Sequence, residues 1–236
     1  MEFRVRLIRA AGAIAAVALL LMACADPLER RVEGLIVEAL PQLLGPAERY
    51  EAQVQGARGD GARFERVRAL GVRVRPERGP VLDRVEAELI DVAVDRAARR
   101  ISALRDARAR LRLQAADLAE YLGRRWIEAP EVRFGDAGEI VVIGRLRVPR
   151  LASTVGPPAE FRGRLVPRGA QLLLAVETLR LGDRAAPALA LGLVEAAINP
   201  LFDAAAHPIP ARFDRVAAEG DALVIEASGS RLPPPD

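Results

Sequence analysis

The stretch Ala107-Arg108-Ala109-Arg110-Leu111-Arg112-Leu113 decides how this chain folds, because small or apolar residues alternate with arginine throughout it. Successive side chains of a β-strand point to opposite faces, so the stretch predicts a strand with one apolar face and one charged face. Such alternation is typical of antiparallel sheets that are packed on one side and solvated on the other. The core is therefore predicted on one side of a β-sheet.

The same period of two recurs along most of the chain. A change of phase at Ile90 predicts a β-bulge within one of these strands. The other predicted strands are Tyr50 to Gln55, Val67 to Val74, Val85 to Val94, Val132 to Phe134, Glu139 to Val148, Glu160 to Val166, Gln171 to Leu181, Ala211 to Ala217 and Ala222 to Ala227. Long antiparallel strands of this kind need helices to cover their apolar side.

The first predicted helix begins at Asp26-Pro27-Leu28-Glu29, which offers an Asp N-cap, a proline at the first helical position and a glutamate two residues later. Apolar residues then follow in steps of three and four as far as Leu44, which indicates a helix with one apolar stripe. Pro41 lies inside this pattern and is predicted to kink or interrupt the helix. A second helix is predicted from about Ala115 to Trp126.

The third predicted helix follows Pro187 and is apolar on nearly all sides, which predicts that it is buried or faces lipid. Asn199-Pro200 is predicted to break or kink it.

The first residues have the pattern of an export signal. Arginines at positions 4, 6 and 9 precede an apolar run from Ala10 to Ala23, which is shorter than the roughly 20 residues that a transmembrane helix needs. The run ends in Leu21-Met22-Ala23-Cys24, which resembles the lipobox of bacterial lipoproteins. This resemblance implies that residues 1–23 are a signal peptide and that Cys24 becomes an acylated N-terminus. An ordinary signal peptide with a chance cysteine and an uncleaved N-terminal anchor are the alternatives.

A lipid anchor at Cys24 predicts a protein of the cell envelope that faces the periplasm or the cell exterior. The residue after Cys24 is alanine and not aspartate, which favours the outer membrane in a cell that has one.

Composition argues against several classes of function. The formal charge is +3, all basic residues are arginine and only 4% of residues are aromatic. Arginines alternate with acidic residues and do not cluster, so no nucleic-acid partner is predicted. One cysteine and one histidine leave no disulfide, and the ligands of a metal site are lacking. No cofactor and no enzymatic activity are predicted, and an esterase that uses His207 is the weaker alternative.

Several segments in order resemble the LmeA-like phospholipid-binding family of bacteria. They are Phe64-Glu-Arg-Val-Arg-Ala-Leu-Gly-Val-Arg-Val, Leu113-Gln-Ala-Ala-Asp-Leu-Ala-Glu-Tyr-Leu, Asn199-Pro-Leu-Phe-Asp, Pro208-Ile-Pro-Ala-Arg-Phe-Asp-Arg-Val and Glu219-Gly-Asp-Ala-Leu-Val-Ile-Glu-Ala. The resemblance implies an α+β fold similar to half of a TULIP protein, in which a long curved antiparallel sheet wraps around amphipathic or apolar helices. It also implies one lipid-binding domain over residues 24–230, and residues 231–236 are predicted to be a disordered proline-rich tail.

The function implied by the resemblance is a non-enzymatic envelope lipoprotein that binds phospholipid or another acyl lipid in an apolar groove and transfers or senses it. The candidate lipid-binding residues are Leu35, Ile36, Leu40, Leu189, Leu193, Ile198, Trp126 and Arg125. Trp126 and Arg125 suit a lipid–water interface, where an aromatic ring anchors and a guanidinium meets phosphate. The alternative is that these residues pack in a closed core, in an envelope scaffold or assembly factor that binds a protein partner.

Overall fold

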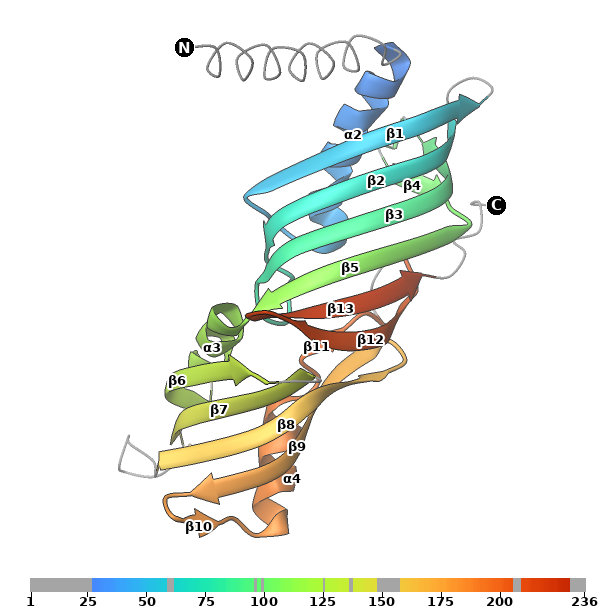
Figure 1. The fold of residues 1–236 in the computed structure, drawn as a ribbon. Helices are drawn as coiled ribbons and strands as arrows, with labels where there is room; N and C mark the ends of the chain where they lie inside the picture. Colours follow the sequence, from blue (N-terminus) through green and yellow to red (C-terminus); the bar gives the residue numbers. More distant parts are fainter. Residues whose placement is uncertain are drawn as a thin grey trace, which may run out of the picture.

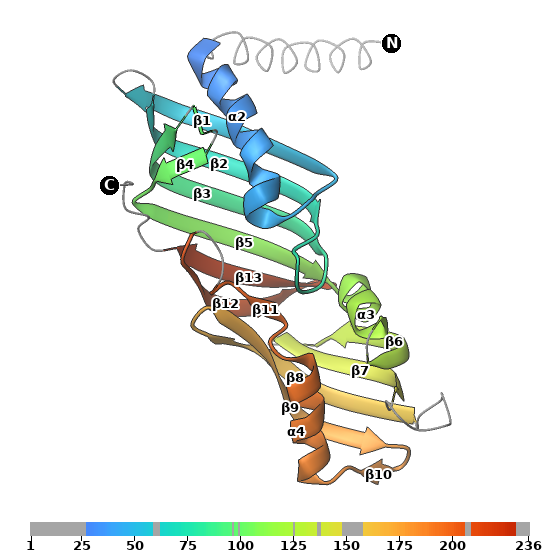
Figure 2. The ribbon, with the colours of Figure 1, turned by 180° about the vertical axis from the view of Figure 1, so that it is seen from behind.

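The structure is a computed structural model of the 236-residue chain. It describes residues 27–58, 62–95, 97–98, 100–124, 126–135, 138–147, 158–205 and 209–229. Two open antiparallel sheets follow one another along the long axis of the molecule. Helices α2 and α4 lie on the same side of these sheets, in front of the strands in Figure 2 and behind them in Figure 1.

The first sheet has seven strands, and its order is β1-β2-β3-β5-β13-β12 with β4 on the end of β3. The stretch that predicted the fold is β5, at the centre of this order, and both of its neighbours are antiparallel to it. The strands are β1 (Arg49–Arg58), β2 (Arg63–Val74), β3 (Leu82–Asp95), β4 (Arg100–Ala103), β5 (Asp106–Gln114), β12 (Ala211–Glu219) and β13 (Ala222–Gly229).

The second sheet has six strands, in the order β10-β9-β8-β7-β6 with β11 beside β9. Its strands are β6 (Ile127–Phe134), β7 (Glu139–Leu146), β8 (Pro158–Arg168), β9 (Gln171–Leu181), β10 (Arg184–Ala185) and β11 (Phe202–Asp203). The α+β class with antiparallel sheet packed around helices is thus confirmed.

The sheet surface is divided, whereas the resemblance implied one long sheet. No strand ladder joins β12 to β8 among the described residues, although the backbone N–H of Phe213 on β12 donates to the carbonyl of Gly169, just after β8, at 2.9 Å. The pairing of β12 with β13 shifts register between Phe213 and Arg215, which marks a bulge. Because a bulge bends its strand, it turns the edge of β12 away from a regular ladder with the next sheet.

The helices largely follow the sequence prediction. Helix α2 (Pro27–Leu44) runs through Pro41 without a break, so the predicted interruption there is wrong. Pro41 lies in the last turn and is exposed, so its ring is accommodated near the helix end. Helix α3 (Ala115–Gly123) ends three residues before the predicted end at Trp126.

Helix α4 (Ala188–Ile198) ends directly before Asn199, as predicted. The side chain of Asn199 explains this end, because it bonds to the backbone of β9. Its Oδ1 accepts from the N–H of Leu174 at 2.7 Å and its Nδ2 donates to the carbonyl of Leu174 at 2.9 Å. These two hydrogen bonds hold Asn199 against β9, so the helix ends there and the chain continues along the sheet into β11.

The predicted change of phase in β3 corresponds to irregular backbone. The strand stays continuous past Ile90, but Asp91 has a φ of 55°, in the left-handed region that few non-glycine residues adopt. The pairing of β3 with β4 shifts register between Ala93 and Val94. The bulge is therefore present, three residues beyond the predicted point.

The buried apolar side chains form two clusters. One lies between α2 and the first sheet and includes Ile36, Leu40 and Phe64. The other includes Leu118 and Leu122 of α3 and continues through the second sheet to α4. This second cluster also contains first-sheet side chains such as Val85, Leu113 and Ile225, so the core continues from one sheet to the other.

Candidate functional site

A row of alanines crosses the inner face of the first sheet, the face on which α2 packs. The strand registers pair Ala52 with Ala69, Ala69 with Ala87, Ala87 with Ala109, and Ala109 with Ala227. The row runs across five adjacent strands, β1, β2, β3, β5 and β13, at right angles to the chain direction. We call these residues the alanine row. Side chains this small leave the sheet surface low along its length.

Apolar residues flank the alanine row. The register row on one side consists of Tyr50, Gly71, Val85, Leu111 and Ile225. The row on the other side consists of Val54, Val67, Leu89, Ala107 and Gly229. The inner face is therefore apolar across its width, and side chains larger than alanine stand on both sides of the row only on β1 and β3.

Helix α2 occupies one end of this face. Its side chains Val32, Ile36 and Leu40 are buried, and Oε1 of Glu33 accepts from the backbone N–H of Val54 at 3.1 Å. The helix packs chiefly against β1 and β4. The small side chains on β1 and β2 admit the helix closely, whereas Ala109 and Ala227 lie further along the row, toward the second sheet.

Tyr50 closes the α2 end of the face. Its hydroxyl donates to the carbonyl of Gly45 at 2.7 Å. Gly45 follows the last residue of α2 and has a φ of 96°, where an added Cβ would lie 2.3 Å from the carbonyl oxygen of Arg75. The turn from helix to sheet thus needs glycine, and the Tyr50 hydroxyl secures it.

We expect the stability of the protein to fall between pH 10 and pH 12 through Tyr50. Burial raises the pKa of Tyr50 from 10.0 to about 12, so the unfolded tyrosine loses its proton at a lower pH than the folded one. The folded state is therefore favoured fully below pH 10, and this contribution is lost as the pH rises through the folded value. Urea unfolding at several pH values should show this decline in the natural chain.

The variant Tyr50→Phe is the matched control. It lacks the hydrogen bond to Gly45, which should cost about 1 kcal/mol at neutral pH. The difference between the two proteins should shrink above pH 10. A difference that stays constant up to pH 12 would contradict the role of the Tyr50 hydroxyl.

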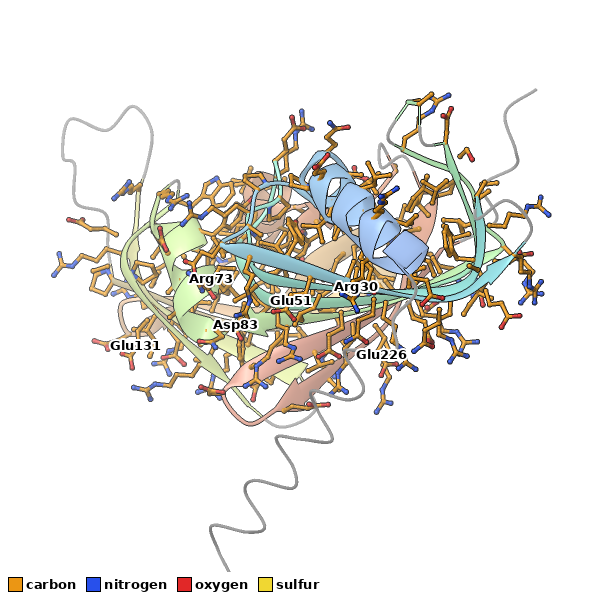
Figure 3. All side chains as sticks on the ribbon, turned by 90° about the horizontal axis from the view of Figure 1, so that it is seen from above. Arg30, Glu51, Arg73, Asp83, Glu131 and Glu226 are labelled. Atoms are coloured by element: carbon orange, nitrogen blue, oxygen red, sulfur yellow. The ribbon has the colours of Figure 1, made fainter. Side chains whose placement is uncertain are left out.

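The outer face of the same sheet carries a hollow of about 620 Å³, which is lined by charged residues such as Arg68, Glu86 and Arg108 and also by the five residues of the alanine row. Oε1 of Glu88 forms salt bridges with Nε of Arg66 at 3.2 Å and with Nε of Arg68 at 3.3 Å. Nε of Arg84 pairs with Oε1 of Glu86 at 2.6 Å. Figure 3 shows Glu226, another residue of this lining, on the side of the sheet away from α2. Because the charges of opposite sign alternate and pair, this face suits contact with water and not with an acyl chain.

A buried ion pair connects the first sheet to α3. Nη1 of Arg73 on β2 donates to both carboxylate oxygens of Asp117, at 2.7 and 2.8 Å. The side chain of Asp117 is only 5% exposed and that of Arg73 is 30% exposed. The hydrogen bond to Asp117 raises the pKa of Arg73, and Arg73 is held at a φ of 54°. The pair fixes the position of α3, which covers the start of the second sheet.

The predicted lipid-binding residues lie in two separate places. Ile36 and Leu40 are buried and Leu35 is half-buried on α2, against the first sheet. Leu189, Leu193 and Ile198 lie on α4, at the far end of the molecule (Figure 2). The structure does not bring the two sets together in one groove, and their assignment to lipid stays a prediction.

On α4 the three predicted residues differ. Ile198 is buried, whereas Leu189 is 77% exposed and Leu193 is 65% exposed. The sequence predicted a helix that is buried or lipid-facing, and the observed helix has one buried and one open side. Trp126 is half-buried, with its ring against Tyr121 at a centroid distance of 5.6 Å, which favours packing over an interface role.

Some predictions lie outside the described residues. They are the acylated Cys24, Arg125, His207 and the tail 231–236. Within the described part of the chain, no three His, Cys, Asp or Glu side chains are grouped to hold a metal ion. No helix there is long and apolar enough to cross a bilayer.

The comparison with family models decides the family. The model of the LmeA-like phospholipid-binding family matches residues 26–228, which is nearly the whole chain after the predicted leader. The chain belongs to the LmeA-like phospholipid-binding family. No curated protein and no solved structure matches this member of the family. The predicted resemblance is thereby confirmed, and it supports lipid binding by this chain.

Sequence reasoning identified alanine, valine and leucine on the inner face but missed the alanine row. The five alanines are far apart in sequence, and only the strand order and register align them. A local sequence signal exists for Ala52, Ala87 and Ala109, which stand inside alternating stretches.

Proposed function

We propose that this member of the LmeA-like phospholipid-binding family holds an acyl chain of a phospholipid against the alanine row, without catalysis, while it is anchored to the envelope by lipid at Cys24. The family match carries lipid binding. The alanine row supplies an apolar strip, and on β3 the larger side chains of Val85 and Leu89 stand on either side of it.

The inner face suits an acyl chain because it offers apolar contact along a line. Each methylene that leaves water for apolar surroundings contributes about 0.8 kcal/mol. Ala69 is only 5% exposed and packs in the cluster that contains α2, so the part of the row left for an acyl chain is Ala87, Ala109 and Ala227, which are half-buried. Their three strands span about two strand spacings of about 4.8 Å, and part of an acyl chain could lie along this length.

The absence of catalysis is part of the proposal. The whole sequence holds one histidine and one cysteine, so a histidine-dependent nucleophile would require His207, and the proposal places lipid on Cys24. The weaker alternative of an esterase is tested with His207→Ala, which should bind lipid as the natural chain does. Ester hydrolysis that disappears in this variant would contradict the proposal.

Lipid binding is tested on protein purified from cells without detergent. Organic extraction followed by mass spectrometry should recover about one phospholipid or other acyl lipid per chain, and labelled phospholipid should exchange into the protein. Recovery of no lipid together with no uptake would overturn the proposed function.

The anchor is tested by growth with an alkyne analogue of palmitate. The natural chain should carry the label in the membrane fraction, and Cys24→Ser should carry none. Label that persists in Cys24→Ser would contradict acylation at this residue. Separation of the inner and outer membranes in the same experiment tests the location of the protein. The proposal expects the labelled chain in the outer membrane of a cell that has one.

A scaffold that binds a protein partner is the second candidate. It is favoured by the buried clusters, in which Ile36, Leu40 and Ile198 are already packed. A scaffold would yield a crosslinked protein partner and no extracted lipid, which is the opposite of the outcome expected here.

A further inference from the structure

The open side of α4 is apolar along its whole length. Leu189 and Leu193 are one helical turn apart and mostly exposed, and Gly192 and Ala196 are exposed beside them. A Cβ added to Gly192 would meet no atom within 4 Å. This surface, which we call the α4 face, consists of Leu189, Gly192, Leu193 and Ala196.

The only charged residue of α4 is turned away from this face. Oε1 of Glu195 accepts from the backbone N–H of Val176 on β9 at 2.7 Å, so its carboxylate is directed at the sheet. The other side of the helix, with Leu191, Val194 and Ile198, packs against the second cluster. The arrangement keeps charge off the α4 face while the helix stays fixed to the sheet.

Helix α2 provides a comparison within the same chain. Its buried side is also apolar, but its exposed side carries Arg30, Arg31 and Glu38. That pattern is ordinary for a helix that faces water. The α4 face has leucine and glycine at exposed positions, where α2 has charged residues. This composition is not that of a helix surface that contacts only water, and it indicates a binding surface.

A basic residue lies beside the α4 face. Arg184 on β10 is exposed and pairs with Leu181 of β9. Leu181 packs against the cluster beneath α4, so Arg184 is on the α4 side of the sheet. Only residues 186 and 187 separate β10 from α4, and β10 lies at the end of the molecule where α4 lies (Figure 1). A guanidinium group beside exposed leucines matches a surface of anionic headgroups above acyl chains.

We propose that the α4 face docks onto the surface of a phospholipid membrane, with Leu189 and Leu193 entering the acyl region and Arg184 meeting anionic headgroups. This membrane contact is additional to the lipid binding proposed above. It rests on that proposal, because a protein that binds phospholipid must reach the membrane that supplies it. The α4 face and the first turn of α2 lie at opposite ends of the molecule (Figures 1 and 2). The α4 face is therefore a contact separate from any anchor near α2.

The test places a fluorophore that responds to polarity at position 193 of the full chain. The chain carries Cys24→Ser, which removes its single natural thiol, and Leu193→Cys for labelling. With vesicles of equal parts phosphatidylcholine and phosphatidylglycerol, the label should brighten several-fold, shift to the blue and be quenched by brominated acyl chains. Thr178→Cys is the matched control, because Thr178 is exposed on β9 and should show none of these changes.

A label at position 193 that stays in water with these vesicles would overturn the docking surface, as would equal changes at position 178. A second variant, Leu189→Ser with Leu193→Ser, changes only exposed side chains and should fold normally. It should bind these vesicles at least about tenfold more weakly. Unchanged vesicle binding by this variant would also contradict the inference.

Binding of a short-chain phospholipid, supplied below the concentration at which it forms micelles, separates the two proposals. The natural chain and the double serine variant should bind it equally, because the inner face is unchanged. If the natural chain binds this lipid but the label at position 193 stays in water, the docking surface fails alone. If neither protein binds this lipid, the proposed function itself fails.

Discussion

Replacing Asp117 by alanine should lower the free energy of unfolding by about 3 kcal/mol, because it leaves a partly buried guanidinium without its carboxylate. Both carboxylate oxygens of Asp117 accept from Arg73 within 2.8 Å. The Arg73 side chain is 30% exposed, so it can turn toward water in part, and this places the loss at the lower end of the range for buried pairs. For a chain of this length, the melting temperature should fall by about 6–12 °C.

The matched control is Glu65→Ala. Glu65 pairs with Arg58 on the neighbouring strand, but both side chains are more than half exposed. Exposed pairs contribute at most about 1 kcal/mol, so this variant should melt close to the natural chain. Equal losses in the two variants would show that the Arg73–Asp117 pair has no special role.

The consequence of the Asp117 loss should be local as well as global. The pair connects β2 to the first turn of α3, and α3 covers the beginning of the second sheet. Amide hydrogen exchange should therefore accelerate first around α3 and β6 in Asp117→Ala. Uniform acceleration across both sheets would indicate that the pair does not hold this junction in particular.

Periodicity predicted the strands because it depends on local sequence. Ala107 to Leu113 is a strand in the structure, and its arginines line the charged outer face as the alternation required. The end of α4 could also be predicted, because the pair Asn199-Pro200 is itself a signal for the end of a helix. In each of these cases the evidence lies within a few neighbouring residues.

Features that depend on strand order were not predictable in the same way. The pairing of β5 with β13 brings Ala109 opposite Ala227, more than a hundred residues later, and no local pattern specifies that neighbour. The same holds for Arg73 and Asp117, which are 44 residues apart. Sequence also could not tell which side of α4 stays open, because its apolar residues surround the helix.

Ala109→Phe should abolish most lipid binding if an acyl chain lies on the alanine row. Ala109 pairs with Ala87 on one side and Ala227 on the other, so a phenyl ring there would stand across the strip. If the ring displaces about three methylenes, the loss at about 0.8 kcal/mol each is about 2.4 kcal/mol, or roughly 50-fold in affinity. Titration with labelled phospholipid measures this change directly.

Arg108→Phe is the control that isolates the inner face. It adds the same ring to the same strand, but the side chain at position 108 points to the opposite face of the sheet and is 76% exposed, so lipid affinity should stay within about twofold of the natural chain. Thermal melting of both variants separates a blocked strip from a damaged fold, and Ala109 is only half-buried, which leaves room for a larger side chain. If Ala109→Phe melts normally and binds lipid as tightly as Arg108→Phe does, the acyl chain does not lie on the alanine row, and the apolar strip serves only to seat α2.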